Sequence, residues 1–346
     1  MSKLMILKEA KTIDYEVVEE RALLGNEVRI KTLYTGISAG TELASYRGSN
    51  PFLSKKWDTA NRIFEKEAET SWSYPLKQWG YEEVGEIVEI GSEVKEVAVG
   101  DVIFGTWGHK SIHITDESFA KDRKLHKELD PICGIFSHIG AIGINAILDA
   151  NIHVGETVAI FGQGVPGQIV TQLAKLNGAR VIAIDLDDTR LSYAKKFGAD
   201  IIINSGKCDT AKEIKEITKG LGADVAIEIS GSSRALHEAI RCTAYSGRVV
   251  ASGFFQGEAA GLFLGEEFHH NRIQLVCSQI SGVDPALSYR WNRLRLNHTV
   301  MDLQKEGKLN LKGLITHVIP FEEAAKAYEM LDKGTEEVLQ IVLSLA

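Results

Sequence analysis

Cysteine is scarce in this chain. Four residues among 346 are cysteines, and they are scattered as Cys133, Cys208, Cys242 and Cys277. No two of them have the spacing of a zinc lobe or a redox motif, and isolated cysteines in mostly apolar contexts are typical of reduced, buried thiols. The scarcity therefore predicts a cytoplasmic protein and excludes a disulfide-stabilised scaffold.

An excess of positive charge and long apolar runs are also missing. The net charge is −8, so the chain has no electrostatic footprint for nucleic acid or for an anionic membrane. No apolar run approaches the roughly 20 residues of a membrane span, and the N-terminal MSKLMILKEAKTIDYE has no signal-peptide core. We expect a cytoplasmic protein without nucleic-acid or membrane partners, and the length allows two domains.

The stretch from Thr157 to Asp185 carries the clearest motif. Gly162, Gly164 and Gly167 directly follow an apolar run and open a helical pattern, and a second apolar run ends in Asp185. The acid lies 18 residues after Gly167, close to the spacing of about 20 in dinucleotide-binding fingerprints. The order of strand, glycine turn, helix, strand and acid therefore predicts a nucleotide site. A glycine-rich turn that binds nothing is the alternative.

Each part of this motif has a physical role. The first glycine permits a tight turn, the second lets the backbone approach a pyrophosphate, and the third lets the helix lie close to the strand. The helix N-terminus supplies amide donors. Asp185 can accept hydrogen bonds from a ribose diol and repel a 2′-phosphate, which favours NAD over NADP, although Arg190 lies nearby. The expected cofactor-binding residues are Gly162, Gly164, Val165, Pro166, Gly167, Asp185 and Arg190.

The hydrophobic pattern divides the chain into a central α/β part and flanking β-rich parts. Central strands are expected at 157–161, 181–185, 201–204, 224–229, 248–253 and 273–278, with helices at 167–177, 188–197, 209–219 and 232–244. Near-continuous apolar strands that alternate with amphipathic helices indicate a doubly wound parallel sheet, covered on both faces.

The first 130 residues instead predict short strands at 27–33, 84–90, 102–105 and 111–115. The tail predicts a strand at 314–319 and a helix at 321–331. An aromatic-rich excursion at 47–79 covers a cleft or forms a satellite apolar cluster. The simplest architecture is a nucleotide domain at 137–280 inserted between two parts of a β domain, 1–136 and 281–346.

Several local strings, in this order, resemble the medium-chain dehydrogenase/reductase superfamily. They are Gly80-Tyr81-Glu82-x-x-Gly85, Val99-Gly100-Asp101-Val102, Val154-Gly155-Glu156-Thr157-Val158, and Leu314-Ile315-Thr316-His317 before Pro320-Phe321. The nearest branch is the zinc-type alcohol and polyol dehydrogenases, near the bacteriochlorophyllide-a hydroxyethyl dehydrogenases. The resemblance covers essentially the whole chain. It implies a Rossmann domain inserted in a GroES-like β-barrel domain, with nicotinamide in the cleft between them, and a homo-oligomer.

The chain departs from the zinc-type pattern at all three metal positions. Ser38 or Ala39 stands where the family has cysteine, Tyr81 replaces a histidine, and Ser137 occupies the third position. Because hydroxyls are poor zinc ligands at neutral pH, we expect no catalytic zinc. An unusual zinc site that uses Glu82, His109 or His138 is the alternative.

The resemblance then implies hydride transfer between nicotinamide and a small-molecule secondary alcohol or ketone. Without a metal, a proton donor or hydrogen bonds must stabilise the developing alkoxide. The expected catalytic residues are Tyr81 as proton donor, Ser38 and Thr41 as a hydroxyl relay, and His138 as a base or substrate contact. Packed or locally bonded side chains remain the alternative for each. The His109 turn could also reach the cleft.

Two other functions stay open at this point. Reduction of an activated C=C bond, as in quinone or enoyl reductases, needs less help at oxygen, so loss of the metal would suit it. A non-catalytic NAD-binding protein is the third reading, since the fingerprint is intact beside a lost metal site.

Overall fold

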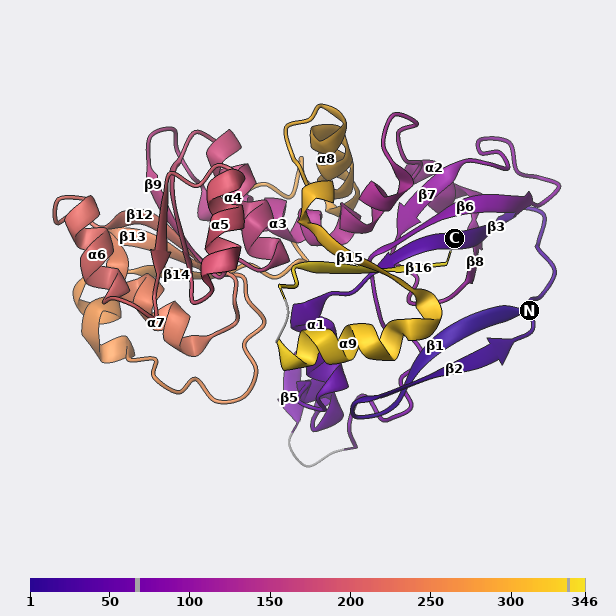
Figure 1. The fold of residues 1–346 in the computed structure, drawn as a ribbon, viewed down its shortest axis with the longest axis horizontal. Coiled ribbons are helices and arrows are strands. Elements are labelled where there is room, and N and C mark those ends of the chain that lie inside the picture. Colours follow the sequence, from indigo (N-terminus) through magenta and orange to yellow (C-terminus); the bar gives the residue numbers. More distant parts are fainter. Residues whose placement is uncertain (66–68, 335–336, 346) are drawn as a thin grey trace. The chain divides into compact units, whose positions relative to one another are not determined.

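The computed structural model describes residues 1–65, 69–334 and 337–345. It divides into two compact units: unit 1 comprises Met1–His138 and Ile315–Ala346, and unit 2 comprises Ile139–Leu314 (Figure 1). One continuous segment is therefore inserted between two parts of the other unit, as the sequence predicted.

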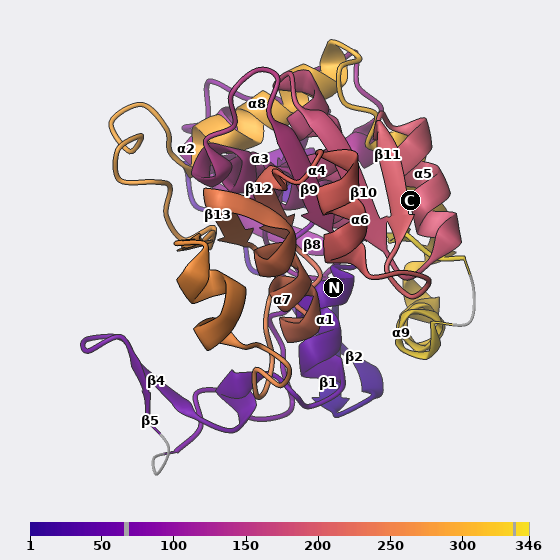
Figure 2. The ribbon, with the colours of Figure 1, turned by 90° about the vertical axis from the view of Figure 1, so that its left-hand side faces the viewer.

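Unit 2 contains a six-stranded parallel sheet with the strand order β11-β10-β9-β12-β13-β14 (Figure 2). The strands are β9 (Thr157–Phe161), β10 (Arg180–Asp185), β11 (Ile201–Asn204), β12 (Ala223–Glu228), β13 (Thr243–Ala251) and β14 (Gln274–Cys277). The helices are α3 (Phe136–Ala150), α4 (Val165–Leu176), α5 (Asp188–Lys196), α6 (Thr210–Ile217), α7 (Ser233–Cys242) and α8 (Arg293–Lys305), of which α3 begins in unit 1. This is the predicted doubly wound sheet.

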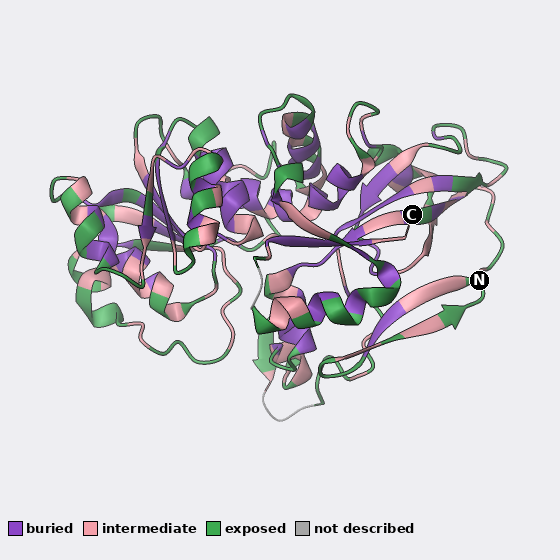
Figure 3. Ribbon diagram, in the orientation of Figure 1, coloured by how far each residue is buried: buried purple, intermediate pink, exposed green. Residues whose placement is uncertain are grey.

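Successive residues of the central strands point to opposite faces of this sheet. Val158 and Ile160 of β9 pack in a core with residues of α3, α4 and α5. Ala159 and Phe161 pack in a second core with residues of α6 and α7. Because both faces are covered, the strands read as unbroken apolar runs, and Figure 3 shows them buried.

Unit 1 is built on a mixed sheet of order β15-β16-β3-β6-β7, with β8 also paired to β3, beside a β1–β2 hairpin. Its strands are β1 (Ser2–Glu9), β2 (Thr12–Val18), β3 (Glu27–Gly36), β4 (Lys56–Asp58), β5 (Ile63–Glu65), β6 (Glu83–Ile90), β7 (Val102–Gly105), β8 (Ile112–Asp116), β15 (Ile315–Pro320) and β16 (Gln340–Ser344). Its helices are α1 (Ala39–Tyr46), α2 (Glu117–Asp122) and α9 (Ala324–Lys333). The hairpin, α1 and β16 were not predicted.

The excursion at 47–79 contains the short hairpin β4–β5 and a cluster of aromatic rings. Phe52 stacks on Trp72 with ring centroids 4.8 Å apart, and Trp57 lies 4.9 Å from Phe64. These rings pack on one another, as the satellite-cluster alternative describes.

Residues 281–314 lie in unit 2, whereas the sequence assigned 281–346 to the returning β domain. The difference arises because α8 packs on α3: a Cβ added to Gly140 would lie 2.5 Å from Val300 Cγ1. The backbone amide of Asn310 also donates to Gln172 Oε1 at 2.8 Å. These contacts hold the segment within the unit that precedes it.

The expectation about apolar runs was wrong for one segment. Pro131–Ala150 is 20 residues long and apolar enough, by length and composition, to cross a membrane. However, 72% of its apolar window is buried inside the structure. Such burial is typical of a core helix in a folded domain. The glycines and alanines within the segment make its apolar character less obvious in the sequence.

Candidate functional site

The four expected catalytic residues meet around Tyr81 in unit 1. Ser38 follows β3 and caps α1, and its hydroxyl is hydrogen-bonded to the Tyr81 hydroxyl. Thr41, in the first turn of α1, also hydrogen-bonds Tyr81. The ring of His138 lies 4.6 Å from the Tyr81 ring at an interplanar angle of 59°. The fold thus gathers side chains from three separate segments into one polar cluster.

Tyr81 keeps its proton in this cluster. Burial raises the pKa of its phenol, the neighbouring Glu82 raises it further, and the hydrogen bonds from Ser38 and Thr41 oppose these effects only in part. Ser38 is buried, whereas Tyr81, Thr41 and His138 are partly exposed. The raised pKa favours the neutral phenol of Tyr81, and the Ser38 hydroxyl lies in contact with it.

A buried ionic network that sequence reasoning missed lies behind this cluster. Glu42 of α1 accepts a hydrogen bond from the Ser38 amide at 2.9 Å, and its other oxygen lies 2.9 Å from His109 Nε2. The Tyr328 hydroxyl donates to the same oxygen of Glu42. On the far side of the imidazole, His109 Nδ1 lies 2.7 Å from Thr35 Oγ1. The sequence suggested that the His109 turn could reach the cleft, and in the structure the His109 side chain is buried in this network, with 1% of the residue exposed.

Two adjacent acids at the start of β6 are also fully buried. Glu83 accepts a hydrogen bond from the Trp107 amide at 2.6 Å, and burial raises its pKa to about 7 although His109 opposes the rise. Neither carboxyl oxygen of Glu82 has a hydrogen-bond partner among the residues that the structure describes. Burial, reinforced by Glu42 and Glu83, holds the pKa of Glu82 well above its usual range. Both effects favour the neutral form of the Glu82 carboxyl.

The sequence contains one indication of this network: the adjacent acids Glu82 and Glu83 directly precede an apolar strand. Charged residues are almost never fully buried unless they are paired, and the sequence around these acids does not show which partners they have. Only the fold shows that the partners come from α1, from the segment before β8, and from α9.

In unit 2, the glycines of the fingerprint have the predicted steric roles. Gly162 has a φ of +96°, and a Cβ there would lie 2.7 Å from Ser230 Cβ. A Cβ on Gly167 would lie 1.8 Å from the carbonyl oxygen of Gly162. Gly164 is the N-cap of α4, and the nearest atom to its added Cβ is Pro166 Cδ at 3.9 Å. Among the described residues, no side chain makes a capping hydrogen bond at the N-terminus of α4, so its amides can bind an anion.

Asp185 ends β10 beside this turn. One carboxylate oxygen accepts the Gln163 amide at 2.6 Å, and the other accepts the amides of Leu186 and Asp187 at 2.8 and 3.0 Å. Arg190 lies in the first turn of α5, with its amide 3.3 Å from Asp187 Oδ1. Val165 and Pro166 form the N-terminus of α4.

The strand order reverses at β9, which lies between β10 and β12, and dinucleotides bind at such switch points. These residues fit a dinucleotide. Glu228, which sequence reasoning missed, ends β12 at the same edge. It accepts hydrogen bonds from the amides of Ser230 and Gly231 at 2.8 and 3.1 Å, and burial raises its pKa to about 7.

Metal-binding geometry is found at a different place. Within residues 1–65, 69–334 and 337–345, one group of three His, Cys, Asp or Glu donors has ligand atoms within 4.8 Å of one another: His237, Glu266 and Glu267. This group lies in unit 2. This group is separate from the Tyr81 cluster, in which Ser38, Thr41 and Tyr81 present hydroxyls.

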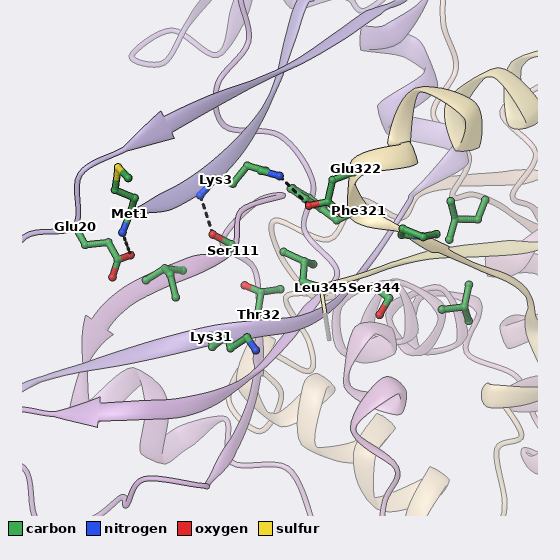
Figure 4. Close-up of a pocket in the computed structure, with 14 residues that line it drawn as sticks. Met1, Lys3, Glu20, Lys31, Thr32, Ser111, Phe321, Glu322, Ser344 and Leu345 are labelled. Atoms are coloured by element: carbon green, nitrogen blue, oxygen red, sulfur yellow. Dashed lines mark hydrogen bonds and ion pairs between the residues drawn. The ribbon is translucent and has the colours of Figure 1, made fainter.

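A cavity of about 550 Å³ in unit 1 is also separate from the Tyr81 cluster (Figure 4). Lys3 pairs with Glu322 there, the Met1 ammonium pairs with Glu20, and the backbone amide of Lys3 donates to the Ser111 hydroxyl. The residues that line the cavity include none of the expected catalytic side chains.

Comparison with known proteins gives relatives along the whole chain. A family model described as zinc-binding dehydrogenase matches residues 166–293. The chain is 33% identical over 331 residues to a D-guloside 3-dehydrogenase of Escherichia coli (strain K12), covering 93% of this chain and 94% of that protein. It is 28% identical over 339 residues to an (R,R)-butanediol dehydrogenase of Bacillus subtilis (strain 168), covering 90% and 91%.

The crystal structure of 2R,3R-butanediol dehydrogenase from Bacillus subtilis matches all of both chains. The TM-score is 0.80 and the sequence identity is 25%. The similarity therefore extends over both units of the chain.

Proposed function

Since this chain belongs to the medium-chain dehydrogenase/reductase superfamily, we propose that it transfers hydride without a catalytic zinc, with Tyr81 as the proton donor. It is an NAD(P)-dependent oxidoreductase that acts on a secondary alcohol or its ketone. The proposal also covers four more specific points: the metal-free route, the proton donor, the preference for NAD and the substrate class.

The donor chemistry at the expected metal positions does not fit zinc. Ser38, Tyr81 and Ser137 offer only hydroxyls, and the first two are hydrogen-bonded to each other. A catalytic zinc needs three nitrogen, thiolate or carboxylate donors and one open position. These observations support a route without Lewis-acid help at this site.

The single observation that carries the proposal is the hydrogen bond between Ser38 and Tyr81. In ketone reduction, a bound nicotinamide would supply hydride to the carbonyl carbon, so that negative charge develops on the carbonyl oxygen. The Tyr81 O–H donates its proton to this oxygen, and Ser38 passes a proton to Tyr81 as it takes one from solvent. Alcohol oxidation reverses each transfer, so that a proton leaves through the same hydroxyls. Thr41 and His138, which contact Tyr81, complete the set.

NAD is the proposed cofactor, because Asp185 lies at the end of β10 beside the glycine turn. A carboxylate there accepts hydrogen bonds from a ribose diol and repels a 2′-phosphate. For the substrate, we propose a hydroxyl-rich secondary alcohol such as a polyol or a glycoside. The support is the 33% identity to a D-guloside 3-dehydrogenase. A cytoplasmic location and a homo-oligomeric state complete the proposal.

The first experiment assays NADH formation from NAD with methyl D-guloside and 2,3-butanediol, and NADH oxidation with enones and quinones. Turnover of an alcohol supports the proposal. Turnover of the enones or quinones alone would replace it with C=C reduction. Cofactor binding without turnover of any of these compounds would favour the non-catalytic reading.

The second experiment tests the proton donor with Tyr81→Phe, which keeps the ring and removes the hydroxyl. We expect kcat to fall by about 10²–10³, the loss typical of one oxyanion donor, with little change in the KM for NAD. Tyr245→Phe is the control, because Tyr245 is 66% exposed and lies in unit 2. An unchanged kcat in Tyr81→Phe would assign Tyr81 a packing role.

A further inference from the structure

His109 lies between the two segments that carry Ser38 and Tyr81. A Cβ on Gly80, the residue before Tyr81, would lie 2.5 Å from His109 Nε2. The chain therefore passes directly against the imidazole just before it reaches Tyr81, and Gly80 takes a φ of +90° to do so. The backbone of His109 is fixed on both sides, since its amide donates to Trp79 O at 3.1 Å and its carbonyl accepts from the Met5 amide at 2.9 Å.

Glu42 connects the same imidazole to Ser38. Ser38 is the N-cap of α1, but its hydroxyl makes no capping hydrogen bond to the helix. A serine at this position ordinarily bonds an amide of the first turn, while an acid in that turn bonds back to the serine amide. Here only the hydrogen bond from the Ser38 amide to the acid is formed, with Glu42 as the acceptor at 2.9 Å. The Ser38 hydroxyl is thereby left for Tyr81.

The charges around His109 favour an imidazolium. Burial acts to lower the pKa of His109, but the carboxylates of Glu42 and Glu83 outweigh it, so that the net pKa is raised. Tyr328 of α9 is the other ionisable group in contact with the ring, at 3.2 Å from Nε2. Burial lowers the pKa of Lys110, the next residue along the chain. The geometry and the direction of the His109 shift together favour a buried ion pair between His109 and Glu42.

We propose that the His109–Glu42 ion pair is a positioning device that holds the Ser38 hydroxyl against Tyr81. Neither residue touches the substrate in this account, because both are fully buried. Loss of the pair frees the Ser38 amide and lets the Ser38 hydroxyl turn to cap α1, which removes the hydrogen-bond partner of Tyr81. The expected effect on turnover rests on the proposed function of Tyr81. The existence of the ion pair does not depend on that function.

The test compares His109→Gln with His113→Gln, measured with methyl D-guloside or 2,3-butanediol as the alcohol and NAD as the cofactor. His113 is a matched control: it lies in the same segment, stacks on Trp107 at 5.0 Å, and burial lowers its pKa to about 3. We expect His109→Gln to lower kcat by about tenfold, on the order of one charge-assisted hydrogen bond, without changing the KM for NAD. His113→Gln should keep the kcat of the wild type.

A double-mutant cycle separates positioning from general destabilisation. If His109 acts through Ser38 and Tyr81, His109→Gln should have no further effect on kcat in the Tyr81→Phe background. An equal fold-loss in both backgrounds would show a merely structural role and overturn the proposal. No change in kcat in either background would overturn it as well.

NMR of the wild-type protein tests the pair without any substrate. We expect both ring nitrogens of His109 to be protonated at neutral pH, and a neutral tautomer would overturn the ion pair whatever Tyr81 does. The Tyr81 Cζ resonance should shift in His109→Gln and not in His113→Gln, and its failure to shift would overturn the link to Tyr81. If His109→Gln does not fold, Glu42→Ala, which removes the acceptor of the Ser38 amide, replaces it in every measurement. By contrast, an unchanged kcat in Tyr81→Phe alone refutes only the donor role in the proposed function.

Discussion

At the scale of single residues, the buried acids of unit 1 differ in how they are compensated. Glu42 faces His109 and the Ser38 amide, and Glu83 accepts the Trp107 amide. Glu82 is equally buried, but it has no partner among the described residues. An unpaired buried carboxylate costs far more free energy than a neutral acid, so the fold holds Glu82 protonated.

This imbalance predicts a pH-dependent gain in stability for Glu82→Gln. The folded pKa of Glu82 is raised above the unfolded value near 4.5. The stability that protonated Glu82 contributes is therefore fully present below that pH and is lost as the pH rises toward the folded pKa. A glutamine side chain does not ionise, so Glu82→Gln does not lose stability in this way. We expect Glu82→Gln to match the wild type near pH 5 and to be more stable by about 1–3 kcal/mol near pH 8, measured by urea unfolding.

Glu86→Gln is the control for this measurement, because Glu86 lies on the same strand and is partly exposed. It should change the free energy of unfolding little at either pH. A loss of stability in Glu82→Gln near pH 8 would contradict a neutral Glu82.

At the scale of elements, the turn between β9 and α4 shows how a sequence motif becomes a binding surface. Gly162 and Gly167 are required by close backbone contacts, whereas the space at Gly164 is open at the N-terminus of α4. Asp185, at the end of the neighbouring strand, anchors the turn through the Gln163 amide. The same carboxylate therefore shapes the turn and lies where a ribose diol would bind.

Cofactor preference follows from this arrangement. We expect NADH to bind at least tenfold more tightly than NADPH, on the order of one repelled charge, as measured by titration of protein fluorescence. Asp185→Ser should narrow the difference, because it removes the negative charge that repels a 2′-phosphate. Asp224→Ser is a control, since Asp224 lies at the start of β12, at the opposite end of the strands. Equal or tighter binding of NADPH by the wild type would contradict the assignment.

At the scale of the whole molecule, the chain has the architecture of a zinc-type family, together with a site that we propose works without zinc. The similarity extends over 93% of the chain in one relative and over all of it in a solved structure. Fold and chemistry are thus separable here, because the site depends on a few side chains placed on a shared scaffold.

Metal analysis tests this separation. We expect no stoichiometric zinc in the protein after dialysis, measured by elemental analysis, and no loss of turnover on treatment with a chelator. The reason is that hydroxyls at Ser38, Tyr81 and Ser137 cannot replace thiolate and imidazole donors. A zinc-containing dehydrogenase treated in parallel serves as the control. One zinc per chain, with turnover lost to the chelator, would show that another ligand set operates.

The sequence by itself determined the parallel sheet, the inserted domain and the cofactor fingerprint. These features are visible in short stretches of sequence: strands covered on both faces read as apolar runs, and the glycines at 162, 164 and 167 lie within one strand–helix turn. The family pattern also identified Ser38, Thr41, Tyr81 and His138, and the structure brings these four together. Their catalytic roles stay a prediction.

Only the tertiary structure decided what lies behind Tyr81. Glu42, His109 and Tyr328 belong to segments far apart in the chain, and each reads as an ordinary polar residue in its own segment. The partners of a buried charge are set by how strands and helices pack, and no local pattern encodes that packing. For the same reason the sequence suggested only that the His109 turn could reach the cleft, whereas the fold buries His109 between the segments that carry Ser38 and Tyr81.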